Sequence, residues 1–233
     1  MEKALQMLRL QQQLNDATNG EGWEAGLTKN GKKIDWKRCI YMECAEMIDS
    51  FAWKHWKNID ADPDWENLQI EIVDVWHFVM SLVLQEYARR ELGTLEDAAK
   101  GIAAMPFYVM LHDDAEGFAD EALVMAQVES VMRDALAPRT DLTKLLADFF
   151  ELVRMGNLDL GTLYRLYVGK NILNRFRQDH GYKAGSYVKI WNGEEDNVVM
   201  KRLWEEKGDM TSEELYAALE AAYPEERDAR MED

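Results

Sequence analysis

The sequence has few cysteines, no long apolar run and no glycine-rich phosphate-binding motif. Its two cysteines, Cys39 and Cys44, share one predicted helix at a spacing that suits neither a CxxC motif nor a disulfide, which favours a reducing, cytoplasmic setting. No stretch reaches about 18 uninterrupted apolar residues, and the polar amino terminus does not resemble a signal peptide. We therefore expect no membrane span. The absence of a GxxxxGK[ST] motif excludes a P-loop mechanism.

Positive charge is also scarce. The chain of 233 residues has 27 Lys and Arg against 44 Asp and Glu, a net charge of −17. This balance argues against non-specific binding to nucleic acid and against docking on an anionic membrane. The exception is residues 165–189, where six basic residues accompany one acid, a local net charge of +5. The acidic balance therefore does not exclude an anionic substrate, because positive charge is concentrated in this segment.

Strand signals are nearly absent, YVKIW at 187–191 being the exception. Apolar residues instead recur at helical spacing, which predicts an all-α helical bundle. Helices are expected through about Asn15, over 35–51 and 64–90, and from start signals at Thr94, Thr140 and Thr211. We predict a core formed by residues 1–90 and 161–222, an inserted helical subdomain at 91–160 and a flexible carboxyl-terminal tail at 223–233.

Two of these helices each carry a pair of acids three residues apart. The pairs are Glu43 with Glu46 and Glu71 with Asp74, and each pair faces one direction on its helix. Both lie within apolar runs, which predicts partial burial. Carboxylates that converge there repel one another by about 4 kcal/mol per close pair at an effective dielectric constant of 20. Cations relieve such repulsion, and oxygen-only ligands favour magnesium or manganese.

A basic stripe complements this predicted four-carboxylate site between two core helices. Lys170, Asn174 and Arg177 fall at i, i+4 and i+7 of a helix that Gly181 would end, which predicts either a phosphate-binding face or a solvated basic face. Carboxylates that hold magnesium and cations that hold phosphates suit cleavage of a nucleoside triphosphate. Since no nucleophile motif is recognised, direct attack by water is favoured.

The acid pairs resemble a known signature. E-x-x-E, 24 intervening residues and E-x-x-D are similar to the motif of the all-α NTP pyrophosphatases, which include MazG-like enzymes. The blocks LQQQLNDATNGEGW, IDWKRCIYMECAEMIDSFAWKHWK, IEIVDVWHFVMSL and YVGKNILNRFRQDHGYKAGSYVKIWNGEEDN resemble the dimeric dUTPase family, whose relatives include phage dCTPase-dUTPases. Together these blocks cover roughly half of the chain, and in residues 91–160 no family block is recognised, so the resemblance assigns no role to that segment.

The resemblance implies a magnesium-dependent homodimer, with manganese as a substitute, that hydrolyses dUTP to dUMP and pyrophosphate, limits uracil in DNA and shares its pocket between subunits. It implies metal ligation by Glu43, Glu46, Glu71 and Asp74, with Glu43 or Glu46 also activating water. The implied substrate contacts are Gln11 and Asn15 with the base, His77 and Phe78 with the deoxyribose, Lys170, Arg177 and Lys189 with phosphates, Trp53 from the partner subunit, and Asn174, Tyr182, Asn192 and Asn197 with sugar, base or phosphate.

Three alternatives stay open. A dCTPase or broader dNTP pyrophosphatase of the same superfamily fits because a carboxamide can flip and pair with cytosine as readily as with uracil; dUDP is a further candidate substrate. A di-iron or di-manganese bundle requires an E-x-x-H motif on each of two helices, and the first acid helix has no histidine near Glu46. A non-enzymatic acidic interaction protein would not need acids within apolar runs.

Overall fold

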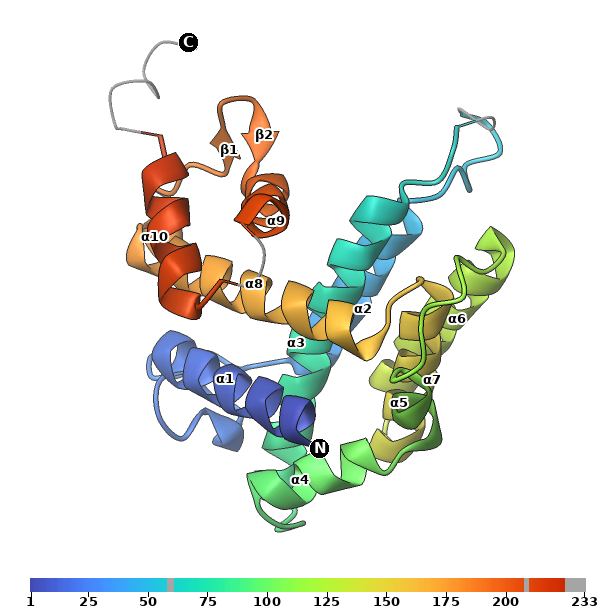
Figure 1. The fold of residues 1–233 in the computed structure, drawn as a ribbon. Helices are drawn as coiled ribbons and strands as arrows, with labels where there is room; N and C mark the ends of the chain where they lie inside the picture. Colours follow the sequence, from blue (N-terminus) through green and yellow to red (C-terminus); the bar gives the residue numbers. More distant parts are fainter. Residues whose placement is uncertain (58–60, 208–209, 225–233) are drawn as a thin grey trace. The chain divides into compact units, whose positions relative to one another are not determined.

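The chain folds as two compact units in a computed structural model that describes residues 1–57, 61–207 and 210–224 (Figure 1). The first unit comprises residues 1–164, and the second begins at Arg165, within helix α8 (Leu160–Asp179). The described residues are mostly helical, as predicted. The grouping of 1–90 with 161–222 stays a prediction, and most of the expected flexible tail, residues 225–233, lies outside the described residues.

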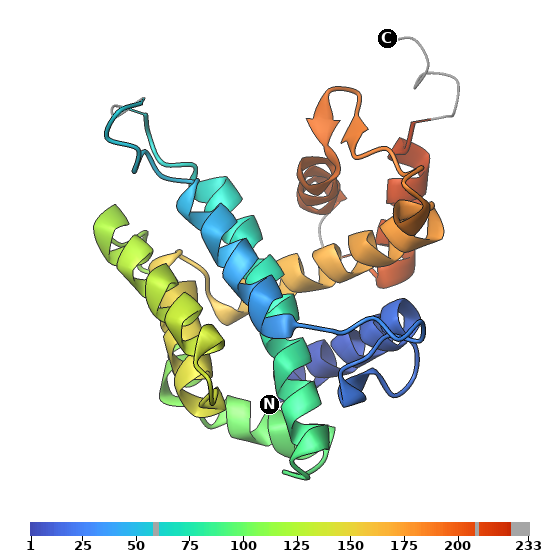
Figure 2. The same cartoon turned by 180° about the vertical axis from the view of Figure 1, so that it is seen from behind.

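Helix α3 is the centre of the first unit. The helices of this unit are α1 (Glu2–Asn19), α2 (Trp36–Ile48), α3 (Trp65–Arg89), α4 (Leu95–Ala103), α5 (Pro106–Met110), α6 (Glu121–Leu136) and α7 (Leu142–Met155), with a 3₁₀-helix η1 (Trp23–Ala25) after α1. Helices α1, α2, α4 and α7 all contact α3, while α6 packs on α2 and α7 (Figure 2). Residues 121–155 of the predicted insert therefore pack directly on the two acid helices.

Helix starts follow the capping chemistry of the sequence. The Asp64 carboxylate accepts a hydrogen bond from the backbone N–H of Asn67 at 2.9 Å, and Thr94 forms a complete capping box with Asp97. The predicted start at Thr140 is wrong by one residue. Asp141 caps α7 instead, because its carboxylate accepts from two backbone N–H groups of the first turn.

The first acid helix is shorter than the predicted 35–51. Helix α2 ends at Ile48, because the next three residues form hydrogen bonds three residues back, such as Ser50 N to Met47 O at 3.1 Å. Ser50 also ties this turn to the start of α3: its carbonyl accepts from Asp64 N at 2.8 Å, and its hydroxyl from Asn67 Nδ2 at 2.9 Å. The turn thereby fixes how α2 enters the loop that leads to α3.

An aromatic core holds α3 against α7. Trp76 is fully buried and stacks on Phe149 with ring centroids 5.0 Å apart and an angle of 10° between the planes. Phe150 and Tyr108 extend this cluster, and the indole N–H of Trp76 points to Met7 Sδ at 3.4 Å. Burial of this size is the main stabilising contribution to such a fold.

Helix α3 is long and apolar enough to cross a membrane by length and composition alone. However, 67% of its apolar window is buried inside the protein. Its apolar character therefore reflects its central position in the first unit.

The second unit surrounds Phe176 of α8 with aromatic side chains. It contains η2 (Tyr182–Ala184), the two-stranded antiparallel pair β1 (Ile190–Trp191) and β2 (Glu194–Glu195), α9 (Asp196–Lys207) and α10 (Ser212–Ala222). Phe176 stacks on His180 with centroids 3.8 Å apart and also contacts Trp191 and Tyr223. The strand signal at 187–191 thus yields a strand of only two residues, while Gly181, with φ of 83°, follows the end of α8 as predicted.

Because Trp76 is fully buried between α3 and α7, Trp76→Ala is expected to lower the free energy of unfolding by about 3–5 kcal/mol. Trp56→Ala is the matched control, since that indole is 66% exposed and its loss should cost about 0.5 kcal/mol or less. Urea unfolding followed by circular dichroism measures both. Equal losses in the two variants would contradict the assigned core.

Candidate functional site

Three carboxylates from α2 and α3 lie together in the first unit. Glu43 and Glu46 are one turn apart on α2, Glu71 comes from α3, and one ligand oxygen of each lies within 4.8 Å of the others. Glu43 and Glu71 are half-buried, and Glu46 is exposed. Two oxygen ligands of one Mg²⁺, each about 2.1 Å from the ion, lie roughly 3–4 Å apart. The three carboxylates are therefore the kind of ligand that a hard divalent cation prefers.

The cluster has three members rather than the four that the sequence predicted. Asp74 lies outside the group of ligand atoms within 4.8 Å. Three residues along a helix correspond to about 4.5 Å of rise, and aspartate is one methylene shorter than glutamate. Asp74 therefore lies about one turn beyond Glu71 on α3, and its role as a ligand stays a prediction.

The neighbouring cysteines do not add reactive thiolates to this cluster. Burial raises the pKa of the Cys44 thiol, and the negative charge of Glu43 raises it further. Burial also raises the pKa of Cys39, with additional contributions from Glu43 and Asp35. Both thiols therefore stay protonated at neutral pH, and the site offers oxygen ligands and no sulfur nucleophile.

Trp53 is anchored near the carboxyl end of α2. Its indole N–H donates to Asp49 Oδ1 at 3.0 Å, and the Lys54 ammonium donates to the same oxygen at 2.8 Å while lying over the indole ring. These hydrogen bonds lower the pKa of Asp49. Trp53 itself is 42% exposed and meets the more exposed Trp56 edge to face. The loop thus presents two indoles to solvent while its base is fixed.

A second group of polar side chains is buried between α1 and α3. We call it the amide cluster; it consists of Gln11, Asn15, His77 and Ser81, none of which is more than 3% exposed. Gln11 Nε2 donates to Asn15 Oδ1 at 3.2 Å and to Ser81 Oγ at 3.0 Å, and Asn15 Nδ2 donates to the same Oγ at 3.0 Å. Gln11 Oε1 lies 2.7 Å from His77 Nδ1. The structure therefore brings three sequence-predicted residues together.

Ser81 is the member of this cluster that sequence reasoning missed. A small hydroxyl in a run of apolar helix residues carries no spacing signal of its own. The only available hint is that Ser81 follows His77 by four residues and so shares its helix face. Phe78, which was predicted, is half-buried and stacks on Trp36 with centroids 6.0 Å apart.

Arg177 in the second unit is held by a buried carboxylate. Its Nε and Nη2 donate to the two oxygens of Asp196, both at 2.8 Å, and Asp196 is fully buried. Arg177 also donates to Asn174 Oδ1 and Asn197 Oδ1, each at 3.2 Å. The buried Lys170 ammonium donates to that same Asn197 oxygen at 2.8 Å. Four predicted residues therefore form one network, which we call the basic cluster.

Asp196 was not predicted, because nothing in the sequence links it to an arginine 19 positions away. Burial alone would raise the pKa of its carboxyl, but the hydrogen bonds and charge of Arg177 outweigh burial and lower it. The Tyr187 hydroxyl donates to Asp196 Oδ2 at 2.8 Å, and burial together with this anion raises the pKa of Tyr187. The carboxylate therefore stays ionised and the phenol protonated across neutral pH.

The other predicted residues of the second unit lie at its surface. Tyr182 is 49% exposed, with its ring 5.9 Å from the Arg177 guanidinium. Lys189 pairs with Glu195 at 3.6 Å, with both side chains about half exposed. Asn192 has φ of 52° and precedes Gly193 in the turn between β1 and β2, which is the preferred asparagine position in such a hairpin. Local structure therefore explains Lys189 and Asn192, whose ligand roles stay predictions.

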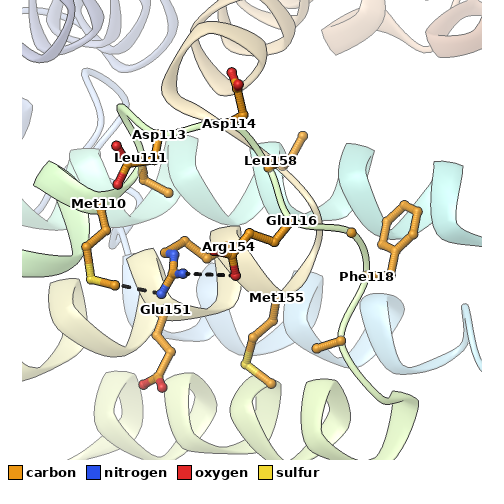
Figure 3. Close-up of a pocket in the computed structure, with 13 residues that line it drawn as sticks. Met110, Leu111, Asp113, Asp114, Glu116, Phe118, Glu151, Arg154, Met155 and Leu158 are labelled. Carbon is orange, nitrogen blue, oxygen red and sulfur yellow. Dashed lines mark hydrogen bonds and ion pairs between the residues drawn. The ribbon is translucent and has the colours of Figure 1, made fainter.

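A hollow of about 390 Å³ lies elsewhere in the first unit, where α5, the loop before α6 and α7 meet (Figure 3). Arg154 crosses it between Glu116, at 3.8 Å, and Met110 Sδ, at 3.9 Å. Its lining includes no residue of the amide cluster or of the three carboxylates Glu43, Glu46 and Glu71, which we call the acid cluster. We therefore place the candidate site at those clusters and not in this hollow.

Asp196→Asn should lower the free energy of unfolding by about 3–5 kcal/mol, because it leaves the Arg177 guanidinium without its buried counter-charge. Glu194→Gln is the control: its pair with Arg202 has the same 2.8 Å distance but is nearly half exposed, so about 0–1 kcal/mol is expected.

The same ion pair sets a pH dependence. Since the folded-state pKa of Asp196 is lowered, its stabilisation is complete above the unfolded value of about 3.9 and is lost as pH falls through the folded value. Urea unfolding at several pH values measures both effects, and identical acid profiles for wild type and Asp196→Asn would contradict the assignment.

Comparison with known protein families identifies a match over most of the chain. The sequence model of a protein family described as dUTPase matches residues 3–182, more than half of the chain. No curated protein matches the chain significantly. The matched range includes the acid cluster, the amide cluster and the α8 part of the basic cluster.

Proposed function

Because the chain belongs to the family of dimeric, all-α dUTPases, which makes it a dUTP diphosphatase by family, we propose that it hydrolyses dUTP to dUMP and pyrophosphate with magnesium as cofactor. The observation that carries this proposal is the cluster of Glu43, Glu46 and Glu71, whose oxygens approach within 4.8 Å on two packed helices. A cluster of this composition suits a hard cation and provides no alternative covalent nucleophile.

Glu43, Glu46 and Glu71 hold the magnesium in this proposal, with Asp74 one turn further along α3. Bound magnesium supplies charge neutralisation at the phosphate oxygens of the substrate. Manganese, with similar ligand preferences, is the expected substitute. The chain's own contribution is to hold three carboxylates close together on two packed helices, which would reduce the rearrangement needed to bind the ion.

Proton transfer falls to a glutamate of α2. Glu46 is exposed and Glu43 half-buried, so either carboxylate can orient a water molecule and accept its proton through an oxygen that does not bind metal. The water oxygen forms a new bond to one of the two phosphorus atoms of the α–β linkage, the bond from that phosphorus to the bridging oxygen breaks, and the product that keeps the bridging oxygen leaves with the electron pair. No covalent enzyme intermediate is required.

The amide cluster is the proposed base site. Gln11 and Asn15 place carboxamides at its centre, and His77 lies within 2.7 Å of Gln11. Gln11, Asn15 and His77 are each only 3% exposed, so a hydrogen bond made to them is stronger than the same bond would be in water. Phe78, next to His77, offers an aromatic edge for the deoxyribose.

Phosphate binding is assigned to the basic cluster. Arg177 and Lys170 belong to the segment with a net charge of +5 in a chain of −17. Asp196 neutralises part of this charge and also fixes the Arg177 guanidinium in one orientation. Asn174 and Asn197 hold the two cations in position through their side-chain oxygens.

A homodimer with a shared pocket completes the proposal. Trp53 and Trp56 are 42% and 66% exposed, which is unusual for residues of this size in one short loop. Since Asp49 anchors Trp53 to the end of α2, the helix that carries Glu43 and Glu46, the loop is suited to close over a neighbouring subunit's substrate.

A nucleotide panel tests the function. The protein is incubated with dUTP, dCTP, dTTP, UTP and dUDP in magnesium, and products are resolved by ion-exchange chromatography. We expect pyrophosphate and dUMP from dUTP at the highest kcat/KM, and none after EDTA treatment. Equal cleavage of dCTP would favour a broader dNTP pyrophosphatase, and cleavage of no nucleotide would overturn the proposal.

Glu46→Gln tests the metal site. Loss of this carboxylate should reduce turnover at least 100-fold and abolish the rise in Tm on adding magnesium, while the helical circular dichroism spectrum stays unchanged. Glu129→Gln is the control, since Glu129 is an exposed glutamate on α6. Near-normal turnover in Glu46→Gln would remove Glu46 from the site.

A further inference from the structure

Ser81 lies at the centre of the amide cluster. Its Oγ is 3.0 Å from both Gln11 Nε2 and Asn15 Nδ2, and it is 2.8 Å from the backbone carbonyl oxygen of His77 one turn earlier. Ser81 has no exposed surface. Three groups from two helices therefore converge on one hydroxyl that solvent does not reach.

The donors and acceptors at this hydroxyl leave one arrangement. A hydroxyl has a single proton, and the His77 carbonyl can only accept, so that proton points to His77. Toward the two carboxamides, Ser81 Oγ can then only accept. If either carboxamide were flipped, its oxygen would face another acceptor in a buried site, which costs about 1–3 kcal/mol. Both amide nitrogens are therefore held toward Ser81.

The rest of the cluster follows from this orientation. The two N–H bonds of Gln11 Nε2 go to Ser81 and to Asn15 Oδ1, and Gln11 Oε1 faces His77 Nδ1, which must carry a proton to donate. Asn15 gives one N–H bond to Ser81 and one oxygen lone pair to Gln11. After these bonds, its carboxamide can still offer one N–H donor and one oxygen lone pair to a ligand.

A carboxamide of fixed orientation distinguishes the two pyrimidines. Uracil presents an N–H donor beside a carbonyl acceptor, and cytosine presents the reverse, a ring-nitrogen acceptor beside an amino donor. For a base held in one place, the carboxamide that pairs with uracil must flip to pair with cytosine. Such a polar mismatch in a buried site is far more discriminating than a difference in shape.

We propose that Ser81 is a positioning residue that locks the carboxamides of Gln11 and Asn15 and thereby sets the preference for uracil over cytosine. The inference rests on the proposed function, because it concerns the base of the same nucleotide. Ser81 touches the two amides and the His77 carbonyl, and it acts on the substrate through Asn15.

The test compares Ser81→Ala with Ser81→Thr, which keeps the hydroxyl, and with Ser130→Ala. Ser130 on α6 makes the same bond to the carbonyl four residues earlier, at 3.0 Å, but lies outside the amide cluster. The readout is kcat/KM for dUTP divided by kcat/KM for dCTP, since a purely structural serine would lower both values together. Circular dichroism and Tm verify folding.

The wild type should prefer dUTP. We expect Ser81→Ala to lower the ratio by about 10-fold, and Ser81→Thr and Ser130→Ala to keep it. If Ser81→Ala does not fold, Ser81→Cys, of similar volume but a weak acceptor, takes its place and the same ratio decides. An unchanged ratio, an equal fall in Ser81→Thr, or a wild type without preference overturns the inference. A wild type that cleaves no nucleotide overturns the proposed function instead.

Discussion

The packing of α2 against α3 forces like charges together, and the site depends on this constraint. At 4.8 Å and an effective dielectric constant of 20, two carboxylates such as Glu43 and Glu71 repel one another by about 3.5 kcal/mol. That is a substantial fraction of the 5–15 kcal/mol by which a domain is typically stable. The aromatic core around Trp76 and Phe149 must therefore hold the helices in place against this repulsion. A bound cation would attract the same carboxylates, and this attraction would offset their mutual repulsion and contribute to the free energy of binding.

The buried polar groups outside the acid cluster differ from it, because donors there are paired with acceptors. In the amide cluster Ser81 Oγ donates to the His77 carbonyl, and at Asp196 the Arg177 guanidinium donates to both carboxylate oxygens. A hydroxyl with one proton orients two carboxamides, and a carboxylate with two oxygens orients one guanidinium. The acid cluster brings groups of like charge together, whereas these two networks pair each donor with an acceptor and contribute rigidity.

Local signals predicted the fold well, and the site only in part. Capping boxes at Thr94 and Thr211, and acids three residues apart, depend on neighbours within one turn, so the sequence displays them directly. Asp74 was grouped with the other acids because spacing gives the direction of a side chain but not how far it reaches. Asp196 and Ser81 were missed because their partners are distant in sequence and are set by tertiary packing.

The predicted end of the first acid helix at Phe51 was wrong for a related reason. Hydrophobic periodicity continues to Phe51, which is buried, and periodicity alone cannot distinguish a last helical turn from a tighter one. Similarly, the strand signal at 187–191 reflects aromatic residues that pack around Phe176 more than it reflects sheet pairing. In both places the pattern of apolar and aromatic residues reflects tertiary packing and does not by itself fix the backbone conformation.

The contact of α6 and α7 with the acid helices bears on how the chain could be divided. The sequence blocks that resemble the family leave out residues 91–160, but the family model spans them, and Phe149 and Phe150 supply the rings against which Trp76 packs. A shortened chain that joined Arg90 to Gly161 would place a tryptophan of the central helix in water. The first unit therefore needs this segment in order to bury its core. A shortened variant without these helices would need other side chains in place of the two phenylalanine rings.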